Sequence, residues 1–158
     1  MKSSAEFSPC RKYRFTLLRT WDETKPYAMF IGLNPSTADE IENDPTVTRC
    51  INYAKSWGYG GLCMTNIFSY RATNPEDMIA EKEPIGDGND DWILKSAKEA
   101  GVVVAAWGDN GSHLGRSKQV RKLVPNLHCL NLNTSGEPTH PLYQKADLKP
   151  TLMPKINN

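Results

Sequence analysis

The sequence has no excess of charge of either sign, because 19 lysine and arginine residues are matched by 18 aspartate and glutamate residues. This balance gives no global electrostatic signal for nucleic acid or a membrane surface, although a local basic face stays open. No apolar run approaches the ~18 residues of a membrane span, and the amino terminus lacks the apolar core of a signal peptide. We therefore expect a cytoplasmic protein without membrane association.

Metal-binding patterns are also missing. Cys10, Cys50, Cys63 and Cys129 lie far apart, with no Cys-x-x-Cys pair and no histidine at zinc-ligand spacing. The last three lie in apolar segments, which favours small buried hydrophobic side chains in a reducing compartment. The sequence predicts no metal site and no cofactor.

Strand-like and helix-like segments alternate along the chain. Apolar runs typical of strands cover 13–21, 28–32, 62–68, 102–107 and 127–132. Helical spacing covers 45–57, 92–100 and 116–124, and Asn74-Pro75 opens another short helix. The charges of 116–124 are interpreted as a solvated face rather than phosphate contacts. We predict one α/β domain over 1–158, a three-layer α/β/α fold with a mostly parallel central sheet of about four strands and an N-terminal edge hairpin strand.

The loop after the apolar run at 28–31 is the first candidate site. Gly32 permits close backbone approach, Pro35 stiffens the turn, and Ser36 and the residues up to Asp39 are polar. Ligands of open α/β sheets bind at the carboxyl ends of strands. A plain strand-to-helix connection remains the alternative.

Further polar residues follow the later strands. Asn66 lies within the apolar strand expected over 62–68, and a buried asparagine in such a strand needs partners for its amide, either neighbouring backbone or a ligand. Arg49, near the start of the helix at 45–57, could reach toward Asn34.

His140 lies between two prolines in a turn-rich segment that ends at Tyr143, and it is the best candidate for a site histidine. A surface loop histidine is the alternative. All these clusters, together with Gly108 to Gly111, are predicted at the same edge of the sheet.

The segment order resembles a bacterial and phage family of unknown function, DUF1643. The motifs that carry this likeness are Gly32-Leu33-Asn34-Pro35-Ser36-Thr37-Ala38-Asp39, Asn43-Asp44-Pro45-Thr46, Trp57-Gly58-Tyr59-Gly60-Gly61, Asn66-Ile67-Phe68-Ser69-Tyr70-Arg71-Ala72-Thr73, Ala106-Trp107-Gly108 and Gly136-Glu137-Pro138-Thr139-His140-Pro141-Leu142-Tyr143. The likeness covers nearly the whole chain and implies no activity.

A more distant likeness does imply one. Gly32-Leu33-Asn34-Pro35, Thr65-Asn66 and His140-Pro141 resemble, in order, three motifs of the uracil-DNA glycosylase superfamily, whose mismatch-specific branch has Gly-Ile-Asn-Pro at the first. The resemblance implies that Asn34 positions the attacking water, Asn66 binds a base edge and His140 stabilises the leaving group.

The same resemblance implies a base-stacking aromatic, for which Phe68 or Tyr70 is nearest, with Arg71 close by. Three departures stand against it. First, no carboxylate occupies the water-activating position, so Asp39 or Asp44 would have to activate the water. Second, the first motif continues into Ser36. Third, Leu142-Tyr143 replaces the residues that form the DNA-intercalating loop.

Three functions therefore stay open. The chain could be an N-glycosidic hydrolase acting on a base in DNA or on a nucleoside. It could instead be a nucleotide-binding or nucleic-acid-binding module without chemistry, or an enzyme of different chemistry on the same fold. The expected partner is a nucleobase-containing ligand, with DNA as one form of it.

Overall fold

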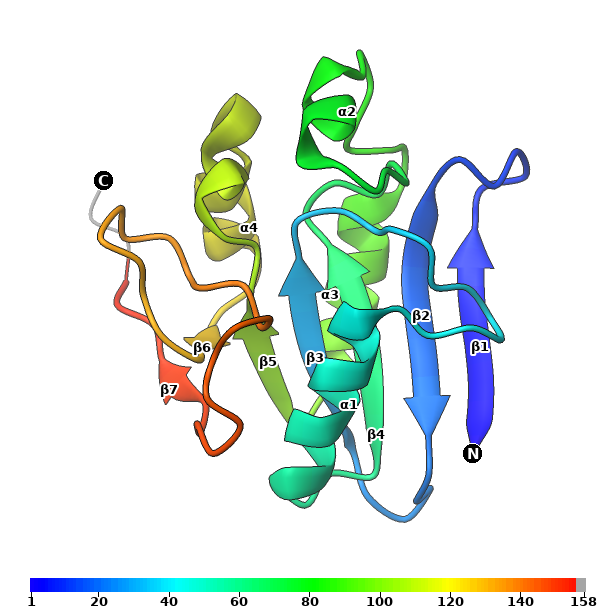
Figure 1. The fold of residues 1–158 in the computed structure, drawn as a ribbon, viewed down its shortest axis with the longest axis vertical. Coiled ribbons are helices and arrows are strands. Elements are labelled where there is room, and N and C mark those ends of the chain that lie inside the picture. Colours follow the sequence, from blue (N-terminus) through cyan, green and yellow to red (C-terminus); the bar gives the residue numbers. More distant parts are fainter. Residues whose placement is uncertain (156–158) are drawn as a thin grey trace.

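A computed structural model describes residues 1–155 and shows a mixed α/β fold built on one sheet of seven strands (Figure 1). The strands, in chain order, are β1 (Lys2–Phe7), β2 (Arg14–Thr20), β3 (Tyr27–Gly32), β4 (Gly61–Asn66), β5 (Val102–Ala105), β6 (His128–Cys129) and β7 (Thr151–Leu152). The helices are α1 (Pro45–Ser56), α2 (Pro75–Ala80), α3 (Asn89–Glu99), the 3₁₀ helix η1 (Asp109–Gly115) and α4 (Arg116–Leu123).

The sheet is larger and more mixed than the sequence predicts. Its order is β1-β2-β4-β3-β5-β6-β7, and the pairs β3/β4, β3/β5 and β5/β6 are parallel. The pairs β1/β2, β2/β4 and β6/β7 are antiparallel. The α/β class is therefore confirmed. The strand expected at the sheet edge, β2, instead lies inside the sheet between β1 and β4.

The differences have local causes. Strand β1 is polar and largely exposed, so it lacks the alternation by which a strand is recognised. The strand expected over 127–132 shortens to two residues because the chain turns away after Cys129 and Leu132 forms an isolated bridge with Pro138. Strand β7 is equally short and carries no sequence signal.

Strands β3 and β4 form the buried centre of the sheet. Every residue of β4 is buried, and so are all residues of β3 after Tyr27, as continuous apolar runs predict for strands covered on both faces. Their register pairs Gly32 with Asn66 at the carboxyl end of both strands. The two polar segments that leave these strands therefore begin side by side.

Helix α1 packs on one face of the sheet. The carboxylate of Asp44 caps the helix by accepting the N–H of Val47 at 2.9 Å, and Pro45 occupies the first turn. Val47, Cys50 and Ala54 then bury one side of the helix against the sheet. The apolar spacing of 45–57 predicts this arrangement.

The opposite face is covered by α3 and α4 (Figure 1). Ile93 of α3 and Val120 of α4 are fully buried there together with Met29 and Ile31. The expectation of a solvated charged face on α4 is wrong at Arg116, which is 1% exposed and donates from Nε to the carbonyl of Ile67 at 2.8 Å.

Two further expectations concern burial. Cys50, Cys63 and Cys129 are buried free thiols, as their apolar surroundings predict, whereas Cys10 is exposed. Burial raises the pKa of the Cys63 thiol to about 12, so it stays protonated. Among residues 1–155 no helix has the length and apolar character needed to cross a membrane.

Candidate functional site

A cavity of about 400 Å³ opens where the carboxyl ends of β3 and β4 meet the amino-terminal end of α1. Its lining residues come from seven stretches of the chain: Arg14; Gly32, Leu33, Asn34, Pro35, Ser36 and Thr37; Asp44, Pro45, Thr46 and Val47; Met64 and Asn66; Ala72, Thr73 and Pro75; Ala106; and His140, Pro141 and Leu142. Asn34, Asn66 and His140 all line this one pocket. Volumes of this size are typical of small-molecule sites.

The floor of the pocket is formed by Gly32 and Asn66. Asn66 is 2% exposed, and its side-chain Nδ2 is buried without a hydrogen-bond partner. A Cβ on Gly32 would lie 2.7 Å from Oδ1 of Asn66, so only glycine leaves room for this amide. A buried unpaired donor costs about 1–3 kcal/mol, and a ligand acceptor would satisfy it.

The side chain of Asn34 is held by backbone. Its Nδ2 donates to the carbonyl of Ala72 at 2.8 Å and to that of Pro35 at 3.1 Å. These bonds join the loop after β3 to the loop after β4 and fix the orientation of the amide. The oxygen Oδ1 is left as the atom of Asn34 that can accept a hydrogen bond from a ligand or a water.

His140 lines the same pocket. Its Nδ1 accepts the backbone N–H of Leu142 at 3.2 Å, so the neutral ring carries its proton on Nε2. The residue as a whole is exposed, but the protein atoms packed around the ring desolvate the imidazole and lower its pKa below the ordinary value, with the charge of Asp44 opposing this shift. The side chain is thus a neutral hydrogen-bond donor at pH 7.

This shift gives a testable pH dependence. The folded-state pKa of His140 is lowered, so the neutral form is favoured by folding, and its contribution to stability is present above pH 6.5 and lost as pH falls through the lower folded value. We expect the His140 imidazole to titrate with a midpoint below 6.5 in an NMR pH series of the folded protein. A midpoint at or above that of the urea-unfolded chain would contradict it.

Two charged residues also line the pocket: Arg14, which the sequence does not place in the site, and Asp44, which it offers beside Asp39 as the water-activating carboxylate. Arg14 is 2% exposed, its Nη1 donates to the carbonyl of Ala38 at 3.0 Å, and its Nε has no partner. Burial lowers the pKa of Arg14 to about 10 despite the nearby carboxylate of Asp44, so the guanidinium stays charged at pH 7. Asp44 also accepts the N–H of Ala38 at 3.4 Å.

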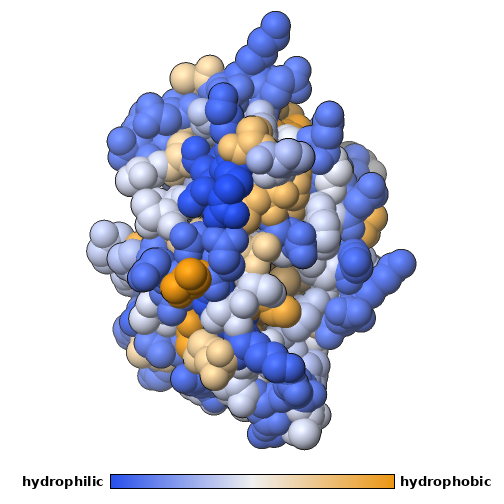
Figure 2. Space-filling model, turned by 90° about the vertical axis from the view of Figure 1, so that its right-hand side faces the viewer, coloured by the Kyte–Doolittle hydropathy of each residue, from blue (hydrophilic) through white to orange (hydrophobic). Residues whose placement is uncertain are grey.

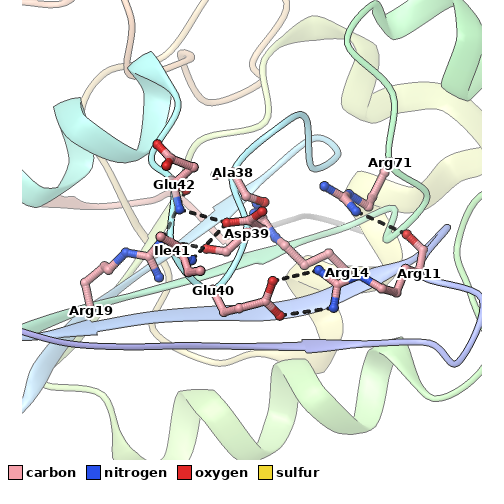
Figure 3. A network of polar contacts seen from close by, with 9 residues as sticks. All are labelled: Arg11, Arg14, Arg19, Ala38, Asp39, Glu40, Ile41, Glu42 and Arg71. Carbon is pink, nitrogen blue, oxygen red and sulfur yellow. Dashed lines mark hydrogen bonds and ion pairs between the residues drawn. The ribbon is translucent and has the colours of Figure 1, made fainter.

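The segment from Ala38 to Glu42, which precedes Asp44, is joined to arginines of β2 by hydrogen bonds (Figure 3). Arg19 donates from Nη2 to the carbonyl of Asp39 at 2.6 Å and from Nε to Oδ1 of Asn43 at 2.9 Å. Asp39 turns its carboxylate back to the N–H groups of Ile41 and Glu42, which lowers its pKa. Asp39 does not line the pocket, whereas Asp44 does.

The predicted aromatic contacts lie elsewhere. Phe68 is fully buried beneath the loop and packs on His113, and Tyr70 packs edge-on against Tyr13. Tyr143 is 98% exposed. Among the described residues that line the pocket there is no phenylalanine, tyrosine or tryptophan, so its apolar surface is aliphatic.

The two predicted arginines are also outside the main pocket. Arg49 lies over the ring of Tyr53 with its guanidinium carbon 5.3 Å from the ring centroid. Arg71 lines an adjoining open depression together with Arg11 and Lys12.

Comparison with known proteins identifies the chain at the level of family. A family model described as "Protein of unknown function (DUF1643)" matches residues 14–142. The chain belongs to the DUF1643 family. No curated protein and no solved structure matches this DUF1643 chain. The matched segment begins at Arg14 and ends at Leu142, so every lining residue of the pocket lies inside it.

Proposed function

We propose that the DUF1643 pocket binds a nucleobase and that the protein hydrolyses the N-glycosidic bond to it. The observation that carries this proposal is the unpartnered, buried amide of Asn66 in the same cavity as Asn34 and His140. An asparagine amide offers a donor and an acceptor side by side, which is the pattern of a base edge. The aliphatic walls at Leu33, Met64 and Leu142 would contact the faces of the ring.

The likeness to the uracil-DNA glycosylase superfamily supports the same conclusion. The three segments that carry it, Gly32-Leu33-Asn34-Pro35, Thr65-Asn66 and His140-Pro141, all contribute to the one pocket. We extend the proposal to the fold, as a uracil-DNA-glycosylase-like arrangement in which α1 covers one face of the parallel strands and α3 and α4 cover the other.

In this mechanism the bond between the sugar carbon and the base nitrogen breaks, and its electron pair leaves with the base. The Nε2–H of neutral His140 donates to the base as negative charge develops on it. Water adds to the sugar carbon, positioned by Oδ1 of Asn34, which cannot itself take the water's proton. Asp44 is the carboxylate among the lining residues and is the proton acceptor in this scheme.

One observation favours a second candidate, a binding module without chemistry. Both carboxylate oxygens of Asp44 already accept backbone N–H groups, from Val47 at 2.9 Å and from Ala38 at 3.4 Å. Both oxygens are thus already occupied as acceptors and are less available to take a proton from water. The base pocket would then recognise a ligand and leave its glycosidic bond intact.

Base release separates the two candidates. Purified protein is incubated with nucleosides and with oligonucleotides that contain uracil, hypoxanthine or a mismatch, and the freed base is measured by chromatography. We expect release to fall about a hundredfold in Asn34→Ala and His140→Ala, as for loss of a transition-state contact. His128→Ala is the matched control, since His128 lies on β6 with Nδ1 2.9 Å from the Asn126 carbonyl.

Three outcomes are informative. Base release that depends on Asn34 and His140 supports the hydrolase. Binding without release supports the module. If the protein neither binds nor cleaves any of these compounds, the proposed function is overturned.

A further inference from the structure

The base pocket continues into a basic depression at its entrance. This depression is lined by Arg11, Lys12, Ser36, Thr37, Arg71, Ala72 and Thr73, and four of these residues, Ser36, Thr37, Ala72 and Thr73, also line the base pocket. A ligand seated on Asn66 would therefore extend over these shared residues toward the three cations.

The cations are not equally available. Arg11 is paired with Glu40 through two bonds of 2.7 and 3.1 Å (Figure 3). Lys12 is exposed, and among residues 1–155 no carboxylate lies within ion-pair distance of it. Arg71 donates one N–H, at 3.3 Å, to the carbonyl of Arg11 and has no ion-pair partner in the same part of the chain.

The guanidinium of Arg71 is nevertheless held in place. Its guanidinium carbon lies 4.8 Å from the ring centroid of Phe7. The guanidinium carbon of Arg11 lies 3.9 Å from the same centroid. A guanidinium that is already positioned loses less side-chain freedom when it binds an anion. The carboxylate of Asp39 is turned to the backbone N–H groups of Ile41 and Glu42.

Neutral donors surround the same space. The hydroxyls of Ser36, Thr37 and Thr73 form no hydrogen bond with the described protein residues, and all three side chains are at least partly exposed. Two free cations beside free hydroxyl donors match the oxygens of a phosphate group. The carboxylates of Glu40 and Asp39 are outside the lining of this depression.

We propose that the ligand of the base pocket carries a phosphate group, which Lys12 and Arg71 bind together with the hydroxyls at the pocket entrance. This proposal rests on the proposed base-binding function and narrows its substrate to a phosphorylated nucleoside or a nucleic-acid strand. The two sources share the phosphate and differ in whether it is a monoester or a diester. Figure 2 shows the face on the β1 side as mainly hydrophilic, with only small apolar patches.

Calorimetric titration tests this with defined probes. Each common nucleoside is compared with its 5′-monophosphate, with a trinucleotide as the diester probe and with inorganic phosphate alone. We expect a monophosphate to bind at least about tenfold more tightly than the matching nucleoside, because the phosphate adds charge-assisted hydrogen bonds to Lys12 and Arg71. A trinucleotide that binds more tightly than the monophosphate would assign the site to a nucleic-acid strand.

The variants Lys12→Ala and Arg71→Ala are expected to remove the phosphate preference and to leave nucleoside affinity unchanged. Lys122→Ala is the control of equal charge, because Lys122 lies on α4 away from both cavities. The preference should also decrease with added salt.

The possible outcomes separate the phosphate-site proposal from the base-binding proposal on which it rests. Nucleosides that bind with no gain from the phosphate overturn the phosphate site and leave the base pocket standing. Phosphate binding that depends on Lys12 and Arg71 without nucleoside binding overturns the base pocket and leaves the phosphate site. If no probe binds, both are overturned.

Discussion

Replacing Asn66 by alanine is expected to weaken nucleoside binding by about a hundredfold and to change the free energy of unfolding by less than about 1 kcal/mol. The affinity falls because the amide is the group that would pair with the base edge. The stability changes little because Nδ2 has no partner in the folded protein, so its removal takes away a desolvation cost along with the packing of the side chain.

Asn89→Ala is the matched control for this experiment. Asn89 is 1% exposed, and its Nδ2 donates to the carbonyls of Asn66 at 2.8 Å and Ile67 at 3.4 Å. Its removal should cost about 1–3 kcal/mol of stability, measured by urea unfolding. A loss of stability in Asn66→Ala as large as that in Asn89→Ala, with binding intact, would show that Asn66 is a structural residue.

Replacing Arg116 by methionine is expected to lower the free energy of unfolding by about 3 kcal/mol. The buried guanidinium bonds the Ile67 carbonyl, Oε1 of Gln119 and the carboxylate of Asp90, so it ties α4 to α3 and to the end of β4. Methionine fills much of the volume but leaves the Ile67 carbonyl without this donor. Urea denaturation of both proteins measures the difference.

Arg121→Met on the same helix is the control. Its guanidinium makes one hydrogen bond, to the carbonyl of Pro154 at 2.9 Å, at an exposed position. We expect this variant to remain within about 0.5 kcal/mol of the parent. Equal losses in the two variants would mean that helix propensity, and not the buried network, sets the cost.

The sequence predicts the pocket's central residues because each of them ends a recognisable strand or lies in a stiffened turn. Asn34 and Asn66 each follow an apolar run, and parallel neighbours bring such ends together. Asp44 was recognisable as a helix cap, and its place in the pocket follows from the start of α1 there. The local residue pattern, together with the rule that the carboxyl ends of parallel strands lie at the same edge of a sheet, is enough to predict these positions.

Other parts of the site depend on contacts that no local pattern encodes. Arg14 has the pattern of an ordinary residue in a half-exposed strand, but it is buried in contact with distant segments: its backbone N–H donates to the Ser69 carbonyl and its Nη1 to the Ala38 carbonyl. Phe68 is near Asn66 in sequence but packs into the core beneath the loop. Arg116 resembles any charged helix residue until the position of α3 is known.

The Gly32–Asn66 pair has a mechanical consequence. Both residues belong to the parallel pairing of β3 and β4, so the floor of the cavity cannot widen without breaking hydrogen bonds between these two strands. A ligand must therefore enter past the loop after β3 and the loop that carries His140. These two loops are the parts that could adjust to a larger or smaller ligand, because the floor at Gly32 and Asn66 is as rigid as the sheet.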